Sequence, residues 1–259
     1  VNLLEAVRQS KNPARAVVIV TTDKVYENKE WLWGYRESDP LGGNDPYSAS
    51  KSMAELAVSS YRKSFFDKKS PTAIASVRAG NVIGGGDFAD FRLIPDAMRA
   101  LMDNAPIDVR NPQSVRPWMH VLDPLSGYLA VAEKLLENGH AYADAWNFGP
   151  KEHKGISCKK IIEKTIHFWK DGTWNDTSNP SAKAEMQQLR LNWEKSAHTL
   201  HCNPVYGWED ALKETVAWFK DFEKYEKNPE ALQMKDTCIT HINRYVDSAK
   251  NQALPWATT

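Results

Sequence analysis

The clearest pattern in the chain is a series of short apolar runs that alternate with amphipathic segments. The first run, 16–20, is continuous rather than alternating, which is typical of a parallel strand covered on both faces. Apolar spacing predicts further strands at 72–78, 107–109 and 145–148, and helices at 47–61, 93–102, 122–137, 157–170, 193–201 and 208–226. The polar segment 172–184 is expected to be a loop. Regular alternation of strands and helices predicts an α/β fold.

Polar and titratable residues follow the first predicted strand directly. They are Thr21, Thr22, Asp23 and Lys24. Open α/β sheets place their sites at the carboxyl ends of parallel strands, so this is a candidate site. Successive strand residues point to opposite faces, so Thr22 and Lys24 would share a face that Asp23 opposes. All three can line one site only if the strand ends near Thr22 and the backbone turns.

A second polar cluster begins the next predicted helix. Tyr47 and Lys51 are four residues apart, which places the phenol and the ammonium on one face, about one turn apart. A free phenol is a poor base at neutral pH, but a nearby fixed cation favours the phenolate, which can take a proton from a sugar hydroxyl. The alternative is an exposed helix pair without function, although this is the only Tyr-x-x-x-Lys in the chain.

Further motifs extend along nearly the whole chain. They are VNLLEAVR, TTDKVY, DPYSASK, VRAGNVIGGGD, LIPD, RPWMHVLDPLSGYL and WNFGP. With these motifs the chain resembles the extended short-chain dehydrogenase/reductase family of nucleotide-sugar enzymes. Within that family it is most similar to the CDP-glucose 4,6-dehydratase subgroup, because its catalytic strand ends in Thr-Asp-Lys. Thymidine-linked dehydratases have Thr-Asp-Glu there, and epimerases usually lack the acidic residue. The turn 81–87 and the run 116–121 resemble the same subgroup.

The resemblance implies a set of roles for the two clusters. Tyr47 would take the proton of the sugar's 4-hydroxyl while hydride passes from that carbon to NAD. Asp23 would protonate the departing 6-hydroxyl, so that water is lost across C5 and C6 before hydride returns to C6. Thr22 would hold the 4-hydroxyl, and Lys51 would orient the cofactor ribose. The expected cofactor contacts are Tyr47, Lys51 and Thr21.

Lys24 occupies the position at which the Thr-Asp-Glu relatives have the glutamate that serves as the C5 base. A lysine could act as this base only if burial or a nearby cation favoured its neutral form. Otherwise its charge would stabilise the enolate or keep Asp23 ionised. The sequence leaves both roles open.

Arginine is expected around the two phosphates of the substrate, because its planar donor fork matches phosphate oxygens. The resemblance implies that Asn81, Arg92, Arg116 and Asn147 contact the nucleotide-diphosphate sugar. Each has a structural alternative, which is a surface charge or ion pair for the arginines and a turn for Asn147. His120 is expected to be structural.

A dinucleotide-binding fold begins with a strand and a glycine-rich turn that holds the pyrophosphate, and no such turn precedes the strand at 16–20. We therefore expect roughly 100 residues, about one βαβαβ half, to be missing before residue 1. The expected fold is the C-terminal part of a Rossmann-like doubly wound parallel sheet over 1–84. A smaller mixed α/β substrate domain, with segments returning to the sheet, would cover mainly 85–226, and a helical tail 227–259. The resemblance also implies a homodimer that forms through the helices near 1–8 and 47–62.

Composition excludes several classes of protein. Thirty-three basic and thirty-three acidic side chains balance, which argues against a nucleic-acid or membrane-surface partner. Cys158, Cys202 and Cys238 are scattered, so reduced thiols are expected rather than a disulfide framework or a metal site. No apolar run approaches the ~18–20 residues of a membrane span, and a cytoplasmic enzyme is expected. The alternatives are another NAD-dependent nucleotide-sugar epimerase or dehydratase, and an inactive protein with this fold.

Overall fold

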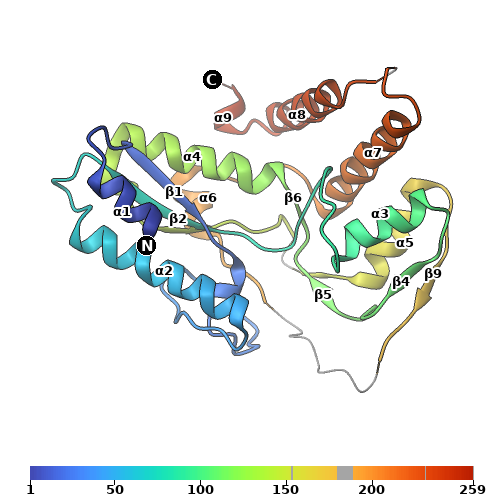
Figure 1. Cartoon of the computed structure of the whole chain (residues 1–259), viewed down its shortest axis with the longest axis horizontal. Coiled ribbons are helices and arrows are strands. Elements are labelled where there is room, and N and C mark those ends of the chain that lie inside the picture. Colours follow the sequence, from blue (N-terminus) through green and yellow to red (C-terminus); the bar gives the residue numbers. More distant parts are fainter. Residues whose placement is uncertain (153, 180–188, 231, 259) are drawn as a thin grey trace. The chain divides into compact units, whose positions relative to one another are not determined.

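The computed structural model describes residues 1–152, 154–179, 189–230 and 232–258, and these divide into two units (Figure 1). Unit 1 consists of Val1–Gly80, Pro124–Gly149 and Leu189–Asn203. Unit 2 consists of the described parts of Asn81–Asp123, Pro150–Gln188 and Pro204–Thr259. The chain therefore leaves each unit and returns to it.

Unit 1 is built around a parallel sheet with the strand order β1-β2-β7. Its strands are β1 (Ala16–Val20), β2 (Ala73–Arg78) and β7 (Ala145–Asn147), and Arg78 lies opposite Asn147 in the register. Parallel neighbours need crossover connections, which contain the helices α2 (Pro46–Ser64) and α4 (Leu122–Asn138). Figure 1 shows α2 and α1 (Asn2–Gln9) on one side of this sheet and α4 on the other. The predicted α/β class is confirmed.

One face of the sheet is covered by apolar side chains of α1 and α2. Leu4 of α1 and Val58 of α2 pack with Ile74 of β2, which is fully buried. Strand β2 is buried along its whole length, but β1 is only half-buried, and Val20 is 52% exposed. The expectation that 16–20 is covered on both faces is wrong. Within the described ranges β1 pairs with β2 alone, and a continuous apolar run does not distinguish an edge strand from a central one.

Short elements complete unit 1. They are the 3-10 helices η1 (Asp23–Val25) and η2 (Gly139–Tyr142), and the helix α6 (Glu194–Leu200). Helix α6 lies against β7, where Ser196 donates its hydroxyl to the carbonyl of Asn147 at 2.7 Å. This contact attaches the returning segment 189–203 to the sheet.

Unit 2 contains helices and short paired strands. The described pairings are β3 (Val82–Ile83) with β6 (Met119–His120), β4 (Ile107–Val109) with β9 (Trp174–Asp176), and β5 (Val115–Arg116) with β8 (Ile156–Ser157). The first two are parallel and the third is antiparallel. The helices are α3 (Leu93–Met102), α5 (Cys158–Trp169), α7 (Trp208–Lys227), α8 (Met234–Asn251) and α9 (Pro255–Thr258). Met98, Ile161 and Leu212 form part of their shared core.

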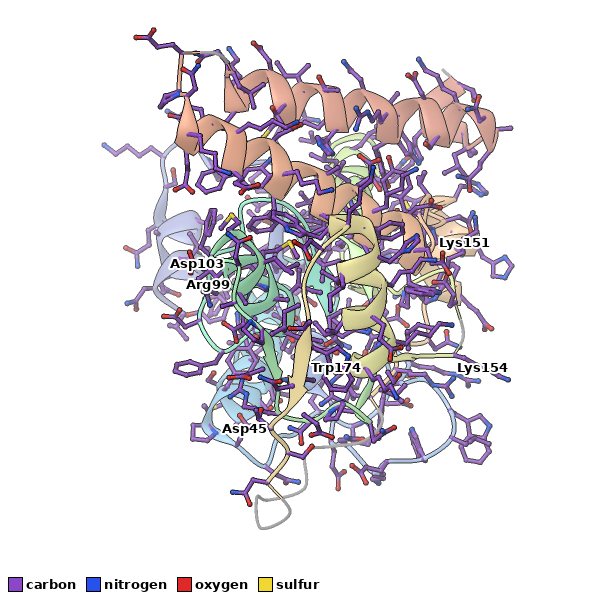
Figure 2. All side chains as sticks on the ribbon, turned by 90° about the vertical axis from the view of Figure 1, so that its right-hand side faces the viewer. Asp45, Arg99, Asp103, Lys151, Lys154 and Trp174 are labelled. Atoms are coloured by element: carbon purple, nitrogen blue, oxygen red, sulfur yellow. The ribbon has the colours of Figure 1, made fainter. Side chains whose placement is uncertain are left out.

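Strand β9 corrects the prediction of a loop over 172–184. Its backbone pairs with Ile107–Val109, and Trp174 packs on the core of unit 2. Figure 2 shows Trp174 on β9, Arg99 on α3, and Asp103 directly after that helix. One apolar residue in a polar run gives no alternating pattern, so only the backbone pairing reveals the strand. The part of this segment from 180 onwards lies outside the described residues.

The remaining helix predictions are confirmed to within one to three residues at each end. In the described part of the chain, Cys158, Cys202 and Cys238 form no disulfide bond, and the first two are buried. Among the helices in the described ranges, none combines the length and apolar character needed to cross a bilayer.

Candidate active site

Strand β1 ends at Val20, and the backbone turns at once into η1. Thr22 caps this 3-10 helix, because its Oγ1 accepts a hydrogen bond from the backbone N–H of Lys24 at 3.4 Å. The N–H of Asp23 donates to the carbonyl of Ala79 at 3.1 Å, which ties the turn to the end of β2. Because the strand ends before Thr22 and the backbone then turns, Thr22, Asp23 and Lys24 are able to line one site.

The carboxyl group of Asp23 is held in a tight, buried position. The residue is 3% exposed, and Thr22 Oγ1 donates to its Oδ1 at 2.9 Å. A Cβ placed on Gly80 would lie 1.9 Å from Asp23 Oδ2, so only glycine leaves room for this carboxyl. Burial raises the pKa of Tyr128 to about 12, and the charge of nearby Asp23 adds to this effect. The hydrogen bond from Thr22 and the close approach to Gly80 therefore fix the conformation of the Asp23 side chain.

Helix α2 begins with a strong capping arrangement that fixes the position of Tyr47. Asp45 Oδ1 accepts the backbone N–H groups of Tyr47 at 2.9 Å and Ser48 at 3.0 Å, and its Oδ2 accepts the Ser48 hydroxyl at 2.5 Å. These bonds from Ser48 hold the pKa of Asp45 below its ordinary value. Pro46 occupies the first turn, where its fixed φ suits a helix and its missing N–H costs nothing.

Tyr47 lies beside the η1 turn. Its ring centroid is 5.8 Å from Lys24 Nζ, and the side chain is 50% exposed. Lys24 is exposed, and Lys51 is half-buried one turn further along α2. Unit 1 therefore brings together the two polar clusters that the sequence predicted. Their arrangement provides a phenol, a cation and a buried carboxyl within one small region.

A buried ion pair beneath α2 was not predicted. Glu55 Oε2 lies 2.8 Å from Arg78 Nη2, and both side chains are almost fully buried. Thr21 donates to Glu55 Oε1 at 2.5 Å, and Ser76 donates to Oε2 at 2.7 Å. Burial by itself would raise the pKa of Glu55, but the hydrogen bonds and charge of Arg78 outweigh it and lower that pKa. The hydroxyl of Thr21 is thus engaged with Glu55, and its contact with a cofactor stays a prediction.

Two signals in the sequence point to this ion pair. Glu55 follows Tyr47 and Lys51 at a repeated spacing of four, which continues along neighbouring parts of one helix surface. Ser76 and Arg78 alternate in the otherwise apolar strand β2, so both point to the same face of the sheet. A charged residue at the end of a buried strand requires a counter-charge, and the helix above supplies it.

Asn147 has several internal contacts, and its predicted contact with the nucleotide stays a prediction. It is fully buried, and its Nδ2 donates to the carbonyls of Tyr35 and Asn192, each at 2.9 Å. Its Oδ1 accepts the hydroxyl of Tyr26 at 2.8 Å. The register places Asn147 beside Arg78, on the face that α2 covers, so its amide joins the network beneath that helix.

The other predicted substrate contacts lie in unit 2. Asn81 has a left-handed backbone (φ 51°), which asparagine tolerates better than most residues. Arg92 is exposed and pairs with Asp87 at 3.0 Å. Arg116 is half-buried in β5, where its Nη1 donates to the carbonyl of Val115 at 3.0 Å. The roles of these three residues toward a substrate stay predictions.

Unit 2 also has a buried cluster of titratable groups. Burial raises the pKa of Asp123 to about 6, although its Oδ1 accepts hydrogen bonds from the Val205 N–H at 2.7 Å and the Tyr245 hydroxyl at 3.0 Å. Burial lowers the pKa of His120 to about 4, and its Nδ1 accepts the N–H of Leu122 at 3.3 Å. His120 is therefore neutral and internal, as expected for a structural histidine.

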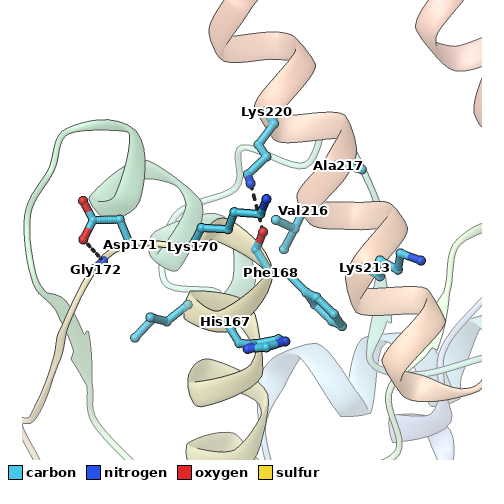
Figure 3. A pocket seen from close by; sticks show the side chains of 10 residues that line it. His167, Phe168, Lys170, Asp171, Gly172, Lys213, Val216, Ala217 and Lys220 are labelled. Carbon is cyan, nitrogen blue, oxygen red and sulfur yellow. Dashed lines mark hydrogen bonds between the residues drawn. The ribbon is translucent and has the colours of Figure 1, made fainter.

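A surface pocket of about 840 Å³ lies in unit 2, at the carboxyl end of α5 (Figure 3). Ile166, Phe168 and Val216 are among its apolar lining residues. Lys220 Nζ donates to the carbonyl of Phe168 at 2.9 Å and so satisfies one of the last carbonyls of α5. The pocket contains none of the predicted catalytic or substrate-binding residues.

The model of the NAD dependent epimerase/dehydratase family matches residues 1–148, which is more than half of the chain. The chain belongs to this family. The matched region contains the η1 turn, Tyr47 and Lys51.

The relatives that the chain resembles in sequence include two 4,6-dehydratases. The chain is 44% identical to the CDP-glucose 4,6-dehydratase of Salmonella typhimurium over 224 residues, which is 85% of this chain and 62% of that protein. It is 27% identical to the dTDP-D-glucose 4,6-dehydratase of Mus musculus over 222 residues, 83% of this chain and 59% of that protein. The chain thus spans less than two thirds of the length of either relative.

Solved structures give the same fold. The dTDP-glucose 4,6-dehydratase of Bacillus anthracis in complex with NAD is 25% identical, with a TM-score of 0.68 over 88% of this chain and 66% of that one. A UDP-glucuronic acid 4-epimerase of Bacillus cereus, at 20% identity, has a TM-score of 0.71 over 85% of this chain and 66% of that one. At 20% identity, the similarity to the epimerase shows a shared fold and nothing about activity.

Proposed function

We propose that the protein is a nucleotide-sugar 4,6-dehydratase that acts on CDP-glucose with NAD as its cofactor. The observation that carries this proposal is the position of Tyr47 beside the turn that holds Thr22 and Asp23. A 4-epimerase needs a base at the 4-hydroxyl but has no leaving group to protonate, whereas a dehydratase needs both groups. The 44% identity to the Salmonella typhimurium enzyme supports the choice of CDP-glucose among nucleotide sugars.

Two residues of unit 1 fit the ribose of a bound dinucleotide. Tyr47 and Lys51 offer a partly exposed hydroxyl and an ammonium at the carboxyl end of a parallel sheet, where doubly wound folds bind such cofactors. The ammonium of Lys51 has three donors, which suits the hydroxyls of a ribose. When bound, NAD would accept hydride from C4 of the sugar and return it to C6.

The acid and base roles follow from burial and position. Tyr47 is exposed enough to reach a sugar, and it takes the proton of the 4-hydroxyl as the ketone forms. Asp23 then gives a proton to the 6-hydroxyl, which leaves as water, while the C5 proton, made acidic by the new C4 ketone, passes to solvent at this partly exposed site. Thr22 donates to Asp23 Oδ1, so it orients the acid in addition to its predicted contact with the 4-hydroxyl.

Lys24 is better suited to an electrostatic role than to that of the C5 base. A lysine that serves as a base or nucleophile in an active site is typically desolvated, and Lys24 is exposed. Its ammonium lies near the ring of Tyr47, where a positive charge stabilises both the phenolate and an enolate on the adjacent sugar. The role of Lys24 is therefore to hold a fixed positive charge at the site.

The experiment incubates the protein in its full natural length with NAD⁺ and CDP-glucose. Mass spectrometry should show a product that has lost one water, and the product should absorb in strong base as a keto sugar. An epimerase would instead give an isomer of unchanged mass. Equal turnover of UDP-glucose or dTDP-glucose would contradict the choice of nucleotide. An intact substrate pool in the presence of bound NAD⁺ would contradict the dehydratase activity.

Two tyrosines of α2 provide a matched pair of variants. Tyr47→Phe removes the proposed base and should lower kcat by about 100-fold or more. Tyr61→Phe removes the same hydroxyl from the same helix, where Tyr61 hydrogen-bonds Glu5, and should keep kcat within about twofold. Equal losses in both variants would contradict the role of Tyr47.

We also propose that the protein forms a homodimer through α1 and α2. Leu3, Met53 and Leu56 are exposed apolar residues on these two helices, and such a set on a protein surface is typical of an interface. Met53→Glu should then shift the molar mass seen by light scattering from a dimer to a monomer.

The expected location of the protein in the cytoplasm stays a prediction.

A further inference from the structure

We infer that Glu55 is a positioning residue, which holds the Thr22–Asp23 turn in register with Tyr47. The inference rests on the proposed function, because the register matters to the acid and base of that reaction. Glu55 itself is buried and touches neither group directly. It acts through Thr21, which precedes the turn.

The first step is the link between α2 and β1. Glu55 lies on α2, two turns after Tyr47, and its Oε1 accepts the hydroxyl of Thr21 at 2.5 Å. Thr21 is the residue that connects the end of β1 to Thr22. One carboxylate therefore joins the helix that carries the proposed base to the segment that carries the proposed acid.

The second step is the immobility of that carboxylate. Its Oε2 accepts hydrogen bonds from Ser76 at 2.7 Å and Arg78 at 2.8 Å, both on β2. Arg78 Nη1 also donates to the Tyr26 hydroxyl at 2.6 Å, and Tyr26 donates to Asn147 of β7. Bonds from several elements leave Glu55 with a single arrangement, as expected for a fully connected buried network.

The third step is a second attachment of the same helix to the far side of the turn. Ser52, one turn before Glu55 on α2, donates its hydroxyl to the carbonyl of Val25 at 2.8 Å. Helix α2 is thus attached to Thr21 before the turn and to Val25 after it. The three residues between these two points are the predicted Thr-Asp-Lys motif.

The alternative is that the Glu55–Arg78 pair only stabilises the fold. Glu55→Gln does not separate the two readings, because it leaves Arg78 buried without a counter-charge and destabilises all of unit 1. Thr21 and Ser76 do separate them. Both donate a hydroxyl to the same carboxylate, but only Thr21 adjoins the turn.

The test compares Thr21→Val, Thr21→Ser and Ser76→Ala in the protein at its full natural length. Thr21→Val should lower kcat for CDP-glucose by about 10- to 100-fold with little change in KM, since a small misplacement of reacting groups has effects of this size. Thr21→Ser restores the hydroxyl and should recover most of kcat. Ser76→Ala should unfold at a similarly reduced urea concentration yet keep kcat within about threefold.

Hydrogen exchange gives a readout that does not depend on turnover. The amides of Asp23 and Lys24 should exchange at least about tenfold faster in Thr21→Val than in Ser76→Ala, because only the first variant releases the turn. Equal exchange in the two variants would overturn the inference even if the wild type is active. If the wild type shows no turnover but the difference in exchange is present, the proposed reaction fails and the positioning role of Glu55 stands.

Discussion

Replacing Gly80 with alanine should displace the proposed general acid without unfolding the protein. An added Cβ would lie 1.9 Å from Asp23 Oδ2, whereas Cβ contacts under 3.0 Å essentially never occur, so the carboxyl must move by about 1 Å. Gly80 is not among the described glycines with a positive φ, so alanine adds no backbone strain there. The perturbation therefore falls on the Asp23 side chain.

The size of the effect follows from that displacement. A misplacement of about 1 Å costs roughly 100-fold in rate, or about 2.7 kcal/mol of transition-state stabilisation. Overpacking costs about 1–3 kcal/mol of folding stability, which is less than the roughly 5–15 kcal/mol of an ordinary domain. Gly80→Ala should therefore stay folded while kcat for CDP-glucose falls by about 100-fold.

The assay measures kcat and KM for CDP-glucose in the protein at full natural length, together with urea unfolding. Gly42→Ala is the matched control, because an added Cβ there lies 3.4 Å from Glu27 Cβ, an ordinary contact. The control should keep kcat within about twofold of the wild type. A folded Gly80→Ala protein with unchanged kcat would refute the claim that this glycine sets the position of Asp23.

Three further predictions concern charge and capping. Lys24→Arg should keep most of kcat and Lys24→Met should lose it, because a fixed charge is needed there and arginine cannot serve as a base near neutral pH. Asp45→Ala should lower the free energy of unfolding by about 0.5–2 kcal/mol and raise KM, since it removes the cap that places Tyr47. Asp123 has a folded pKa of about 6, above its unfolded value of about 3.9, so its contribution to stability is full below pH ~4 and lost as the pH rises through about 6. Asp123→Asn cannot ionise, so it should flatten that decline and stabilise the fold at pH 7 by up to about 3 kcal/mol.

Each of these predictions has a simple contrary outcome. An inactive Lys24→Arg would restore the C5-base role. Asp45→Asn should retain the cap, and equal destabilisation by asparagine and alanine would contradict it. Urea unfolding from pH 4 to pH 8 tests the predicted effect of Asp123 on stability. A wild type whose stability rises over that range, or an Asp123→Asn variant that parallels it, would contradict the raised pKa.

The strands and helices of unit 1 were predictable because their apolar periodicity is long and regular. The helix from Tyr47 onward and the strand ending near Arg78 are each recognised from one segment alone. The partial burial of β1 was not, because burial depends on which segments lie beside a strand and not on its own residues. Strand β9 was missed for the same reason, since backbone hydrogen bonds to 107–109 define it.

Some residues of the candidate site were predictable from the sequence, and others were not. Tyr47, Lys51 and the Thr-Asp-Lys turn were predictable because each is a local pattern with a chemical purpose. The contacts of Glu55 join residues that are 34 and 23 positions apart, so the local signals at Glu55 and Arg78 mark two polar positions without showing that they pair. The contacts of Asn147 were likewise not predictable, because they join its amide to Tyr35, Asn192 and Tyr26, which are distant in the sequence.

The Glu55–Arg78 pair has a consequence for engineering this protein to resist heat. Well-packed apolar replacements of a buried pair are often neutral or stabilising by about 1–4 kcal/mol, so selection for melting temperature alone would accept them. Such replacements would also release Thr21. A thermostable variant obtained in that way would stay folded, but Asp23 and Tyr47 would no longer be held in a fixed relative position.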